Sequence, residues 1–187
     1  QHRLETMRQQ TPDAKLRHTW VNYEQISSHL KRAVIATEDA RFTQHQGFDY
    51  KAIETAWKKN LKQRKLAAGG STISQQLAKN LFLSSEKTVW RKAQEVLVTL
   101  MLEEFLTKRR ILEIYLNIIE WGEGVFGIEA AARHYFGVPA SSLTAEQSAW
   151  LASIISNPRF YDTHRQSPRL RKKAGIILSR LPTATIP

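Results

Sequence analysis

Three observations predict that this sequence folds as a mainly α-helical domain. Apolar residues recur at intervals of three and four through most of its 187 residues, which places them on one face of a helix. No segment shows a convincing alternation of apolar and polar residues, the pattern of a half-buried strand. The hydrophobic content of 42% is too high for a disordered chain, and the length is enough for one domain with a buried core.

The helices follow from these apolar stripes. In chain order they are expected at about 26–37, 52–61, 88–107, 110–119, 128–136, 145–155 and 169–181, with irregular loops at 39–49, 66–72 and 120–127. The 110–119 helix turns Ile111, Leu112, Tyr115 and Ile118 toward the core. Thr144 and Gln147 have the spacing of a capping box at the start of the 145–155 helix, and Asn157-Pro158 ends it.

The composition favours an anionic partner. The chain has 28 Lys+Arg against 17 Asp+Glu, a formal net charge of +11, which suits nucleic acid, a phosphorylated substrate or an acidic membrane surface equally well. The absence of cysteine excludes disulfides, thiolate zinc sites and a cysteine nucleophile. The longest nearly apolar run, Val96–Leu102, is far shorter than the roughly 20 residues that cross a bilayer.

The 88–107 helix carries a candidate functional carboxylate. It is apolar on nearly all sides, because Val98 and Leu102 lie on the face opposite its main stripe, so we expect it to be mostly buried. Glu95 is then a buried carboxylate with Arg91 one turn before it. Two interpretations remain open: an ordinary i,i+4 ion pair, or a carboxylate that faces a cleft and is tuned by the cation.

A second candidate lies where the first helix ends. Glu38 and Asp39 stand at a helix C-terminus, where acidic residues oppose the macrodipole, and a broken local rule often marks a functional site. His45 follows in the next loop. We interpret it as a structural hydrogen-bonding residue, because no metal-binding spacing such as His-x-x-x-His surrounds it.

A third candidate is the segment Ala68–Gln76, in which two glycines and Ser71-Thr72 lead into a helix N-terminus. Such an end offers free N–H groups to an anion, although a mobile linker with an N-cap explains the spacing as well. Lys79 lies one turn further on. Two separated carboxylates and a polar, cationic cleft suit the transfer of a sugar from a phosphorylated donor.

These segments resemble, in order, the motifs of the peptidoglycan glycosyltransferases (glycosyltransferase family 51). The matching segments are 38–49, 69–81, 91–95, 110–117 and 127–137, and 119–126 is similar to the single-domain, monofunctional branch of Gram-negative bacteria. The resemblance implies a lysozyme-like, mainly α fold with a large lobe and a small membrane-facing lobe. It implies a glycosyltransferase domain over 23–187, preceded by a segment over 1–22 and, before that, a membrane helix that anchors the enzyme in the inner membrane with the domain on its periplasmic side.

The resemblance also implies a reaction. Lipid II would be polymerised into β-1,4-linked glycan strands with inversion and release of polyprenyl pyrophosphate. Glu38 matches the general base and Glu95 the second catalytic carboxylate, which we expect to act near the pyrophosphate with a divalent cation, Mg²⁺ or Mn²⁺. The expected substrate-binding residues are Ser71, Thr72, Gln75, Gln76, Lys79, Arg91 and Lys92. Asp39, Phe42, His45 and Gly47 are expected to brace the first-motif loop.

The expected partners are lipid II, the growing glycan strand, the membrane surface and other cell-wall synthesis or division proteins. The basic stretch Lys51–Lys65, with Trp57, Leu61 and Leu66, is expected to touch acidic lipid, although a solvated helix face explains it too. Two alternatives stay open. A lysozyme-like hydrolase would share the helical fold and one glutamate, and a nucleic-acid-binding module would share the charge but not the arrangement of bases.

Overall fold

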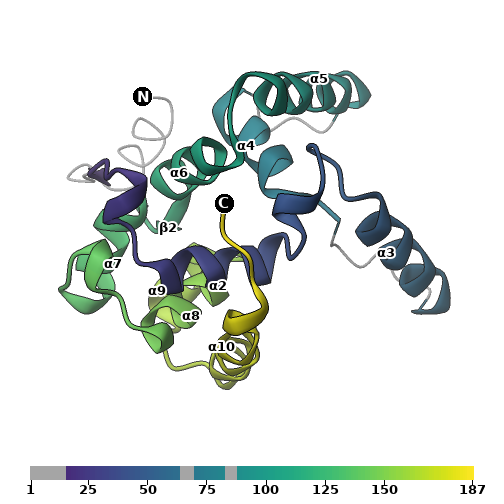
Figure 1. Cartoon of the computed structure of the whole chain (residues 1–187). Helices are drawn as coiled ribbons and strands as arrows, with labels where there is room; N and C mark the ends of the chain where they lie inside the picture. The colour runs from purple at the N-terminus through teal and green to yellow at the C-terminus, as the bar shows by residue number, and fades with distance from the viewer. Residues whose placement is uncertain (1–15, 64–69, 83–87) are drawn as a thin grey trace. The chain divides into compact units, whose positions relative to one another are not determined.

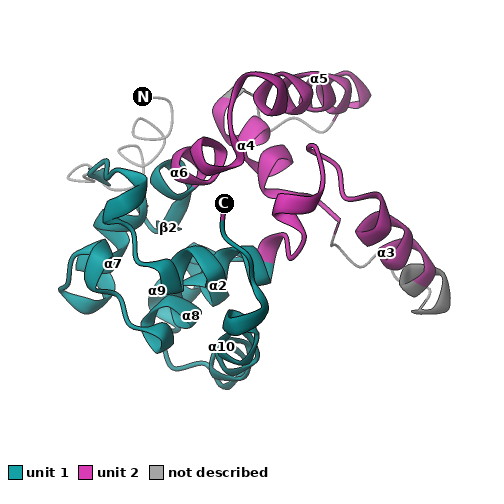
Figure 2. Ribbon diagram, viewed as in Figure 1, with its two compact units in different colours: residues 1–37, 116–186 teal, residues 38–115, 187 magenta. Residues whose placement is uncertain are grey.

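The structure is a computed structural model that describes residues 16–63, 70–82 and 88–187 (Figure 1). Its mainly α-helical character confirms the fold class predicted from the sequence. The chain divides into two compact units (Figure 2): unit 1 comprises residues 1–37 and 116–186, and unit 2 comprises residues 38–115 together with Pro187. Two helices, α2 (Ser28–Glu38) and α6 (Lys108–Ile118), run across the division, so that Glu38 and Tyr115 belong to unit 2.

Unit 1 is a set of helices around a small sheet. Beside most of α2 and the end of α6, it contains η1 (Tyr23–Gln25), α7 (Ile128–Phe136), η3 (Ala140–Ser142), α8 (Ala145–Ile154), α9 (Pro158–Thr163), α10 (Pro168–Arg180) and η4 (Leu181–Thr183). The predicted capping box is confirmed, since Gln147 N donates to Thr144 Oγ1 over 3.3 Å and Thr144 N donates to Gln147 Oε1 over 3.0 Å. α10 packs along α8, whose Leu151 and Ala152 are fully buried.

The sheet corrects the prediction that 120–127 is an irregular loop and that the chain has no strands. β1 (Arg17–His18) pairs in parallel with β3 (Val125–Phe126), which pairs antiparallel with β2 (Glu120–Gly122), so the strand order is β1-β3-β2. Strands of two or three residues are too short to show an alternating pattern, which is why the sequence did not reveal them. Asn117 secures the segment after β1, because its side chain exchanges two 2.9 Å hydrogen bonds with the backbone of Val21.

Unit 2 contains η2 (Phe42–Gln44), α3 (Tyr50–Gln63), α4 (Ile73–Phe82), α5 (Val89–Phe105) and the first part of α6. α4 packs against α5, and its Ile73, Leu77 and Ala78 are fully buried. The tight turn before α3 depends on Gly47, whose φ of +84° is a left-handed conformation that side chains with a Cβ rarely adopt. The predicted loop 66–72 and the residues Arg64, Lys65 and Leu66 lie largely or wholly outside the described residues.

The structure corrects the expectation that the 88–107 helix is mostly buried. Among the residues of α5, Glu95 and Thr99 are the buried ones, whereas its main apolar stripe is exposed. We call this stripe the α5 apolar face; it consists of Val89, Val96, Leu97, Leu100 and Met101. The pattern of apolar residues correctly predicted a helix but not which side of it meets the rest of the unit.

Among the described residues, no helix is both long enough and apolar enough to span a membrane.

Candidate active site

Every site residue predicted from the sequence belongs to unit 2. Glu38 is the last residue of α2, the first-motif loop passes through η2, and the second motif covers nearly all of α4. The third motif lies in the first two turns of α5. One compact unit therefore carries both candidate catalytic carboxylates.

Glu38 is half-buried and is held by a side-chain amide. Gln76, in the first turn of α4, donates from Nε2 to Glu38 Oε2 over 3.0 Å. Gln76 Oε1 in turn accepts a 2.8 Å hydrogen bond from the hydroxyl of Tyr115. The carboxylate at the end of α2 is thus connected to α4 and α6 through one glutamine.

Asp39 connects the first-motif loop to the start of α4. Its Oδ1 lies 2.8 Å from His45 Nε2, and its Oδ2 accepts a 3.0 Å hydrogen bond from the backbone N–H of Ile73. The second contact satisfies one of the free N–H groups at the N-terminus of α4, where a negative charge is also stabilised by the helix dipole. Asp39 is buried, so both contacts are shielded from water.

Gly47 brings the first-motif loop close to both α4 and α5. Its carbonyl accepts a 2.6 Å hydrogen bond from Thr72 Oγ1. A Cβ at this position would lie 2.9 Å from Thr99 Cγ2 and 3.3 Å from Glu103 Cγ, so the approach of the loop to α5 requires a glycine. Phe42, fully buried, lies beneath the ammonium of Lys108, which is 4.6 Å from the ring centroid.

The second motif is ordered by its own side chains. Thr72 N donates to Gln75 Oε1 over 3.0 Å and Gln75 N donates to Thr72 Oγ1 over 3.2 Å, a reciprocal arrangement that caps α4. Both residues are buried, while Ser71 and Lys79 are exposed. In this structure Thr72 and Gln75 shape the start of α4, whereas Ser71 and Lys79 face solvent.

Glu95 is surrounded by cations from its own helix. Lys92 Nζ lies 2.5 Å from Glu95 Oε1, and Arg91 Nη1 lies 3.6 Å from Glu95 Oε2. The Glu95 carboxylate is buried, the Arg91 side chain is only 16% exposed, and Arg91 Nε and Nη1 have no hydrogen-bond partner. These two buried donors can still bind an anion.

The described residues include one group with the geometry to hold a metal ion: single donor atoms of Asp39, His45 and Asp49 lie within 4.8 Å of one another. Asp49 is already paired with the Arg41 guanidinium and accepts a 2.8 Å hydrogen bond from the N–H of Ala52, so its charge is balanced without a metal ion. Glu95, the metal ligand expected from the sequence, is outside this group.

Sequence reasoning missed two residues of this region. Tyr115 was assigned to the core from its position in an apolar stripe, and no pattern showed that its hydroxyl reaches Gln76. Burial, followed by the nearby carboxylates of Glu38 and Asp39, raises the pKa of Tyr115 well above its ordinary value, which keeps the phenol protonated. Glu103 was not singled out either; its Oε1 accepts hydrogen bonds from Ser74 Oγ and, over 2.7 Å, from Lys108 Nζ.

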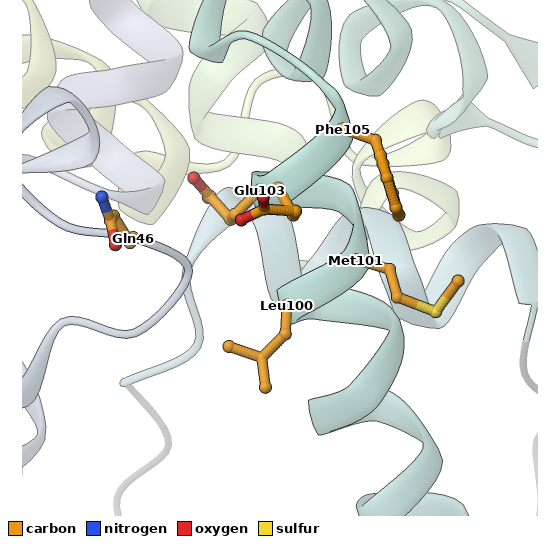
Figure 3. A pocket seen from close by; sticks show the side chains of 6 residues that line it. Gln46, Leu100, Met101, Glu103 and Phe105 are labelled. Carbon is orange, nitrogen blue, oxygen red and sulfur yellow. The ribbon is translucent and has the colours of Figure 1, made fainter.

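A pocket of about 370 Å³ lies beside Glu103. Figure 3 shows Leu100, Met101, Glu103 and Phe105 extending from α5, with Gln46 on a separate segment, and Glu104 completes the lining. The lining combines exposed apolar side chains of α5 with carboxylates.

Comparison with known proteins shows which family this sequence matches. The sequence matches the family described as Transglycosylase over residues 4–182. It is 88% identical to the biosynthetic peptidoglycan transglycosylase of Nitrosomonas eutropha over 187 residues, which cover 100% of this chain and 77% of that protein. It is 81% identical to the protein of the same name from Nitrosomonas europaea, with the same coverage, and 62% identical to the one from Nitrosospira multiformis, covering 100% of this chain and 81% of that protein.

Proposed function

This chain belongs to the transglycosylase family and is a peptidoglycan glycosyltransferase, and we propose from its site that it polymerises lipid II. The observation that carries the proposal is the pairing, in one unit, of a half-buried carboxylate fixed by an amide with a buried carboxylate surrounded by cations. The first carboxylate, Glu38, suits a general base that takes a proton from an acceptor hydroxyl. The second, Glu95, lies among cations that suit the binding of a pyrophosphate.

The proposed reaction forms one glycosidic bond and breaks one sugar–phosphate bond. Glu38 takes the proton of the 4-hydroxyl of the acceptor sugar while that oxygen attacks the anomeric carbon of the donor. The electron pair of the broken bond leaves with the polyprenyl pyrophosphate, and the anomeric centre inverts to give a β-1,4 linkage. A positioned base of this kind contributes about 10²- to 10⁴-fold to the rate.

Arg91 and Lys92 are proposed to stabilise the charge that develops on the departing pyrophosphate. Arg91 has two buried donors without a hydrogen-bond partner, and Lys92 is half-exposed, so both can turn toward a phosphate oxygen. Glu95 would hold these two cations in place before substrate arrives. Ser71, exposed just before α4, and Lys79, exposed in its last turn, are proposed to contact sugar and phosphate oxygens.

We also propose assistance by Mg²⁺ or Mn²⁺ at Glu95. A single carboxylate suits such an ion, because Mg²⁺ in proteins is commonly held by one or two carboxylates together with substrate phosphates. Bound there, the ion would neutralise phosphate charge. Before such an ion binds, Lys92 and Arg91 already balance the charge of Glu95.

The proposal places unit 2 against the outer surface of the inner membrane. Tyr50, Ile53 and Trp57 of α3 are exposed, as are Lys51 and Lys58 on the same helix. The α5 apolar face adds an exposed surface that includes Leu97, 60% exposed. Exposed apolar side chains beside lysines suit the interface of an anionic bilayer, where each cation contributes about 1 kcal/mol.

The deciding experiment supplies purified protein with lipid II and Mg²⁺ and analyses the products. Glycan polymer is the expected product. Muropeptides released from finished sacculi, with no polymer from lipid II, would instead identify a hydrolase. Salt-sensitive binding of DNA without polymerisation would overturn both enzymatic assignments.

A further inference from the structure

Both polar groups of the Gln76 amide are hydrogen-bonded: one partner accepts a hydrogen bond and the other donates one. Its Nε2 is 3.0 Å from the carboxylate of Glu38, and its Oε1 is 2.8 Å from the phenol oxygen of Tyr115. An ionised carboxylate can only accept, so the amide must present its N–H₂ to Glu38. The carbonyl end then faces Tyr115, which must donate.

Tyr115 is suited to this donor role at any physiological pH. It is fully buried within unit 2, and burial together with the charges of Glu38 and Asp39 raises the pKa of its hydroxyl. The phenol therefore does not ionise, and its proton stays available to Gln76 Oε1. If the hydroxyl were absent, the carbonyl end of the amide would lose its partner, and the N–H₂ group would be held less firmly against the carboxylate of Glu38.

We propose that Tyr115 is a positioning residue for the reaction: by holding the carbonyl end of the Gln76 amide, it keeps the amide N–H₂ on Glu38 and so keeps that carboxylate aimed as the general base. This inference rests on the proposed function, because it concerns the same base. The chain of contacts runs from α6 through α4 to the end of α2 and lies entirely within unit 2. It gives Gln76 a role in holding the base rather than in binding a sugar oxygen.

The direction in which the pH profile should move follows from the hydrogen bond that Gln76 donates to Glu38. An N–H that donates to a carboxylate favours the ionised form, so loss of that donor raises the pKa of the base. In a profile of kcat/KM against pH, the acidic limb should therefore move to higher pH. Activity lost at neutral pH should be partly recovered at higher pH, which a general loosening of the fold would not produce.

The experiment compares Tyr115→Phe and Gln76→Leu with the unmodified chain, using lipid II polymerisation from pH 5 to 9. At neutral pH Tyr115→Phe is expected to lower kcat roughly tenfold with KM for lipid II changed less than about twofold, since the lost contact is a hydrogen bond in a chain that ends on a charged group. Gln76→Leu is expected to lower kcat further and to shift the acidic limb more. Tyr161→Phe is the matched control, because Tyr161 is also buried but lies on α9 in unit 1.

The outcomes separate this inference from the proposed function. If the unmodified chain makes no polymer, the proposed function is wrong. If it does, and both variants give acidic limbs that coincide with that of the unmodified chain, the positioning role is wrong. The same conclusion holds if Tyr161→Phe reproduces the loss seen in Tyr115→Phe, or if Tyr115→Phe raises KM and leaves kcat unchanged.

Discussion

The contact of Gly47 with α5 gives the sharpest prediction about stability. Gly47→Ala imposes two separate costs, because φ is +84° and because the new Cβ would lie 2.9 Å from Thr99 Cγ2. A left-handed conformation costs a residue with a Cβ about 1–2 kcal/mol, and overpacking a buried contact costs about 1–3 kcal/mol. The free energy of unfolding should fall by roughly 2–5 kcal/mol, which in a protein of this size lowers Tm by roughly 4–20 °C.

Two further variants separate the backbone and steric contributions to this loss in the free energy of unfolding. Gly137→Ala meets the same backbone strain, since its φ is +69°, but nothing lies within 4 Å of the new Cβ, so only about 1–2 kcal/mol should be lost. Thr99→Ser removes Cγ2 and keeps the hydroxyl that donates to Glu95 O over 2.7 Å. Combined with Gly47→Ala, it should recover the steric part alone. The measurement is thermal and denaturant unfolding followed by circular dichroism.

Equal losses of stability in Gly47→Ala and Gly137→Ala would contradict a steric contact between the loop and α5. The same contact would be contradicted if Thr99→Ser did nothing for the Gly47→Ala chain. Either result would mean that the loop does not pack on α5 as described.

Four other predictions concern the reaction, the metal ion and the membrane. Glu38→Gln should abolish polymerisation while lipid II binding and Tm stay near those of the unmodified chain; near-normal turnover would remove Glu38 as the base. Glu95→Gln should lower kcat about 10²-fold, because Arg91 and Lys92 lose their ion-pair partner. Chelation by EDTA should slow polymerisation by the unmodified chain until Mg²⁺ or Mn²⁺ is restored. Full activity in EDTA would contradict the assignment of a divalent cation. Leu97→Asn should weaken binding to vesicles that contain anionic phospholipid roughly tenfold, measured by sedimentation. The control Ile176→Asn makes an equally large change at an exposed residue of unit 1 and should have little effect. Equal losses in the two variants would argue against a membrane-binding surface on α5.

The sequence predicted those elements that carry local signals. The helix expected at 128–136 is found as α7 with the same bounds, because Gly127 and Gly137, both with positive φ, stand immediately outside it. The capping box of α8 was likewise readable from two residues three positions apart. Such features depend on neighbours in the chain, so a single sequence is enough to reveal them.

The orientation of α5 could not be predicted in this way. Its apolar residues outnumber its polar ones, and the usual preference would bury them, yet Glu95 and Thr99 form the buried side. Thr99 packs against Gly47, and Glu95 forms ion pairs with Lys92 and Arg91. The burial of this face therefore depends on a loop about fifty residues earlier in the chain and on ion pairs. An exposed apolar face costs free energy in water, and this cost is removed only when that face is covered, as a bilayer would do.

The polar residues of the second motif make different kinds of contact in this structure. Its polar side chains match a substrate-binding pattern by type, but Thr72 and Gln75 use their hydrogen bonds to cap α4, and Gln76 uses both of its ends on Glu38 and Tyr115. Under the proposed function, the groups left to bind a donor pyrophosphate are therefore Ser71, Lys79 and the cations of α5. Exchanging Lys79 for Gln should then raise KM for lipid II, whereas exchanging Gln76 should lower kcat, and the two parameters distinguish a residue that binds substrate from one that holds the base.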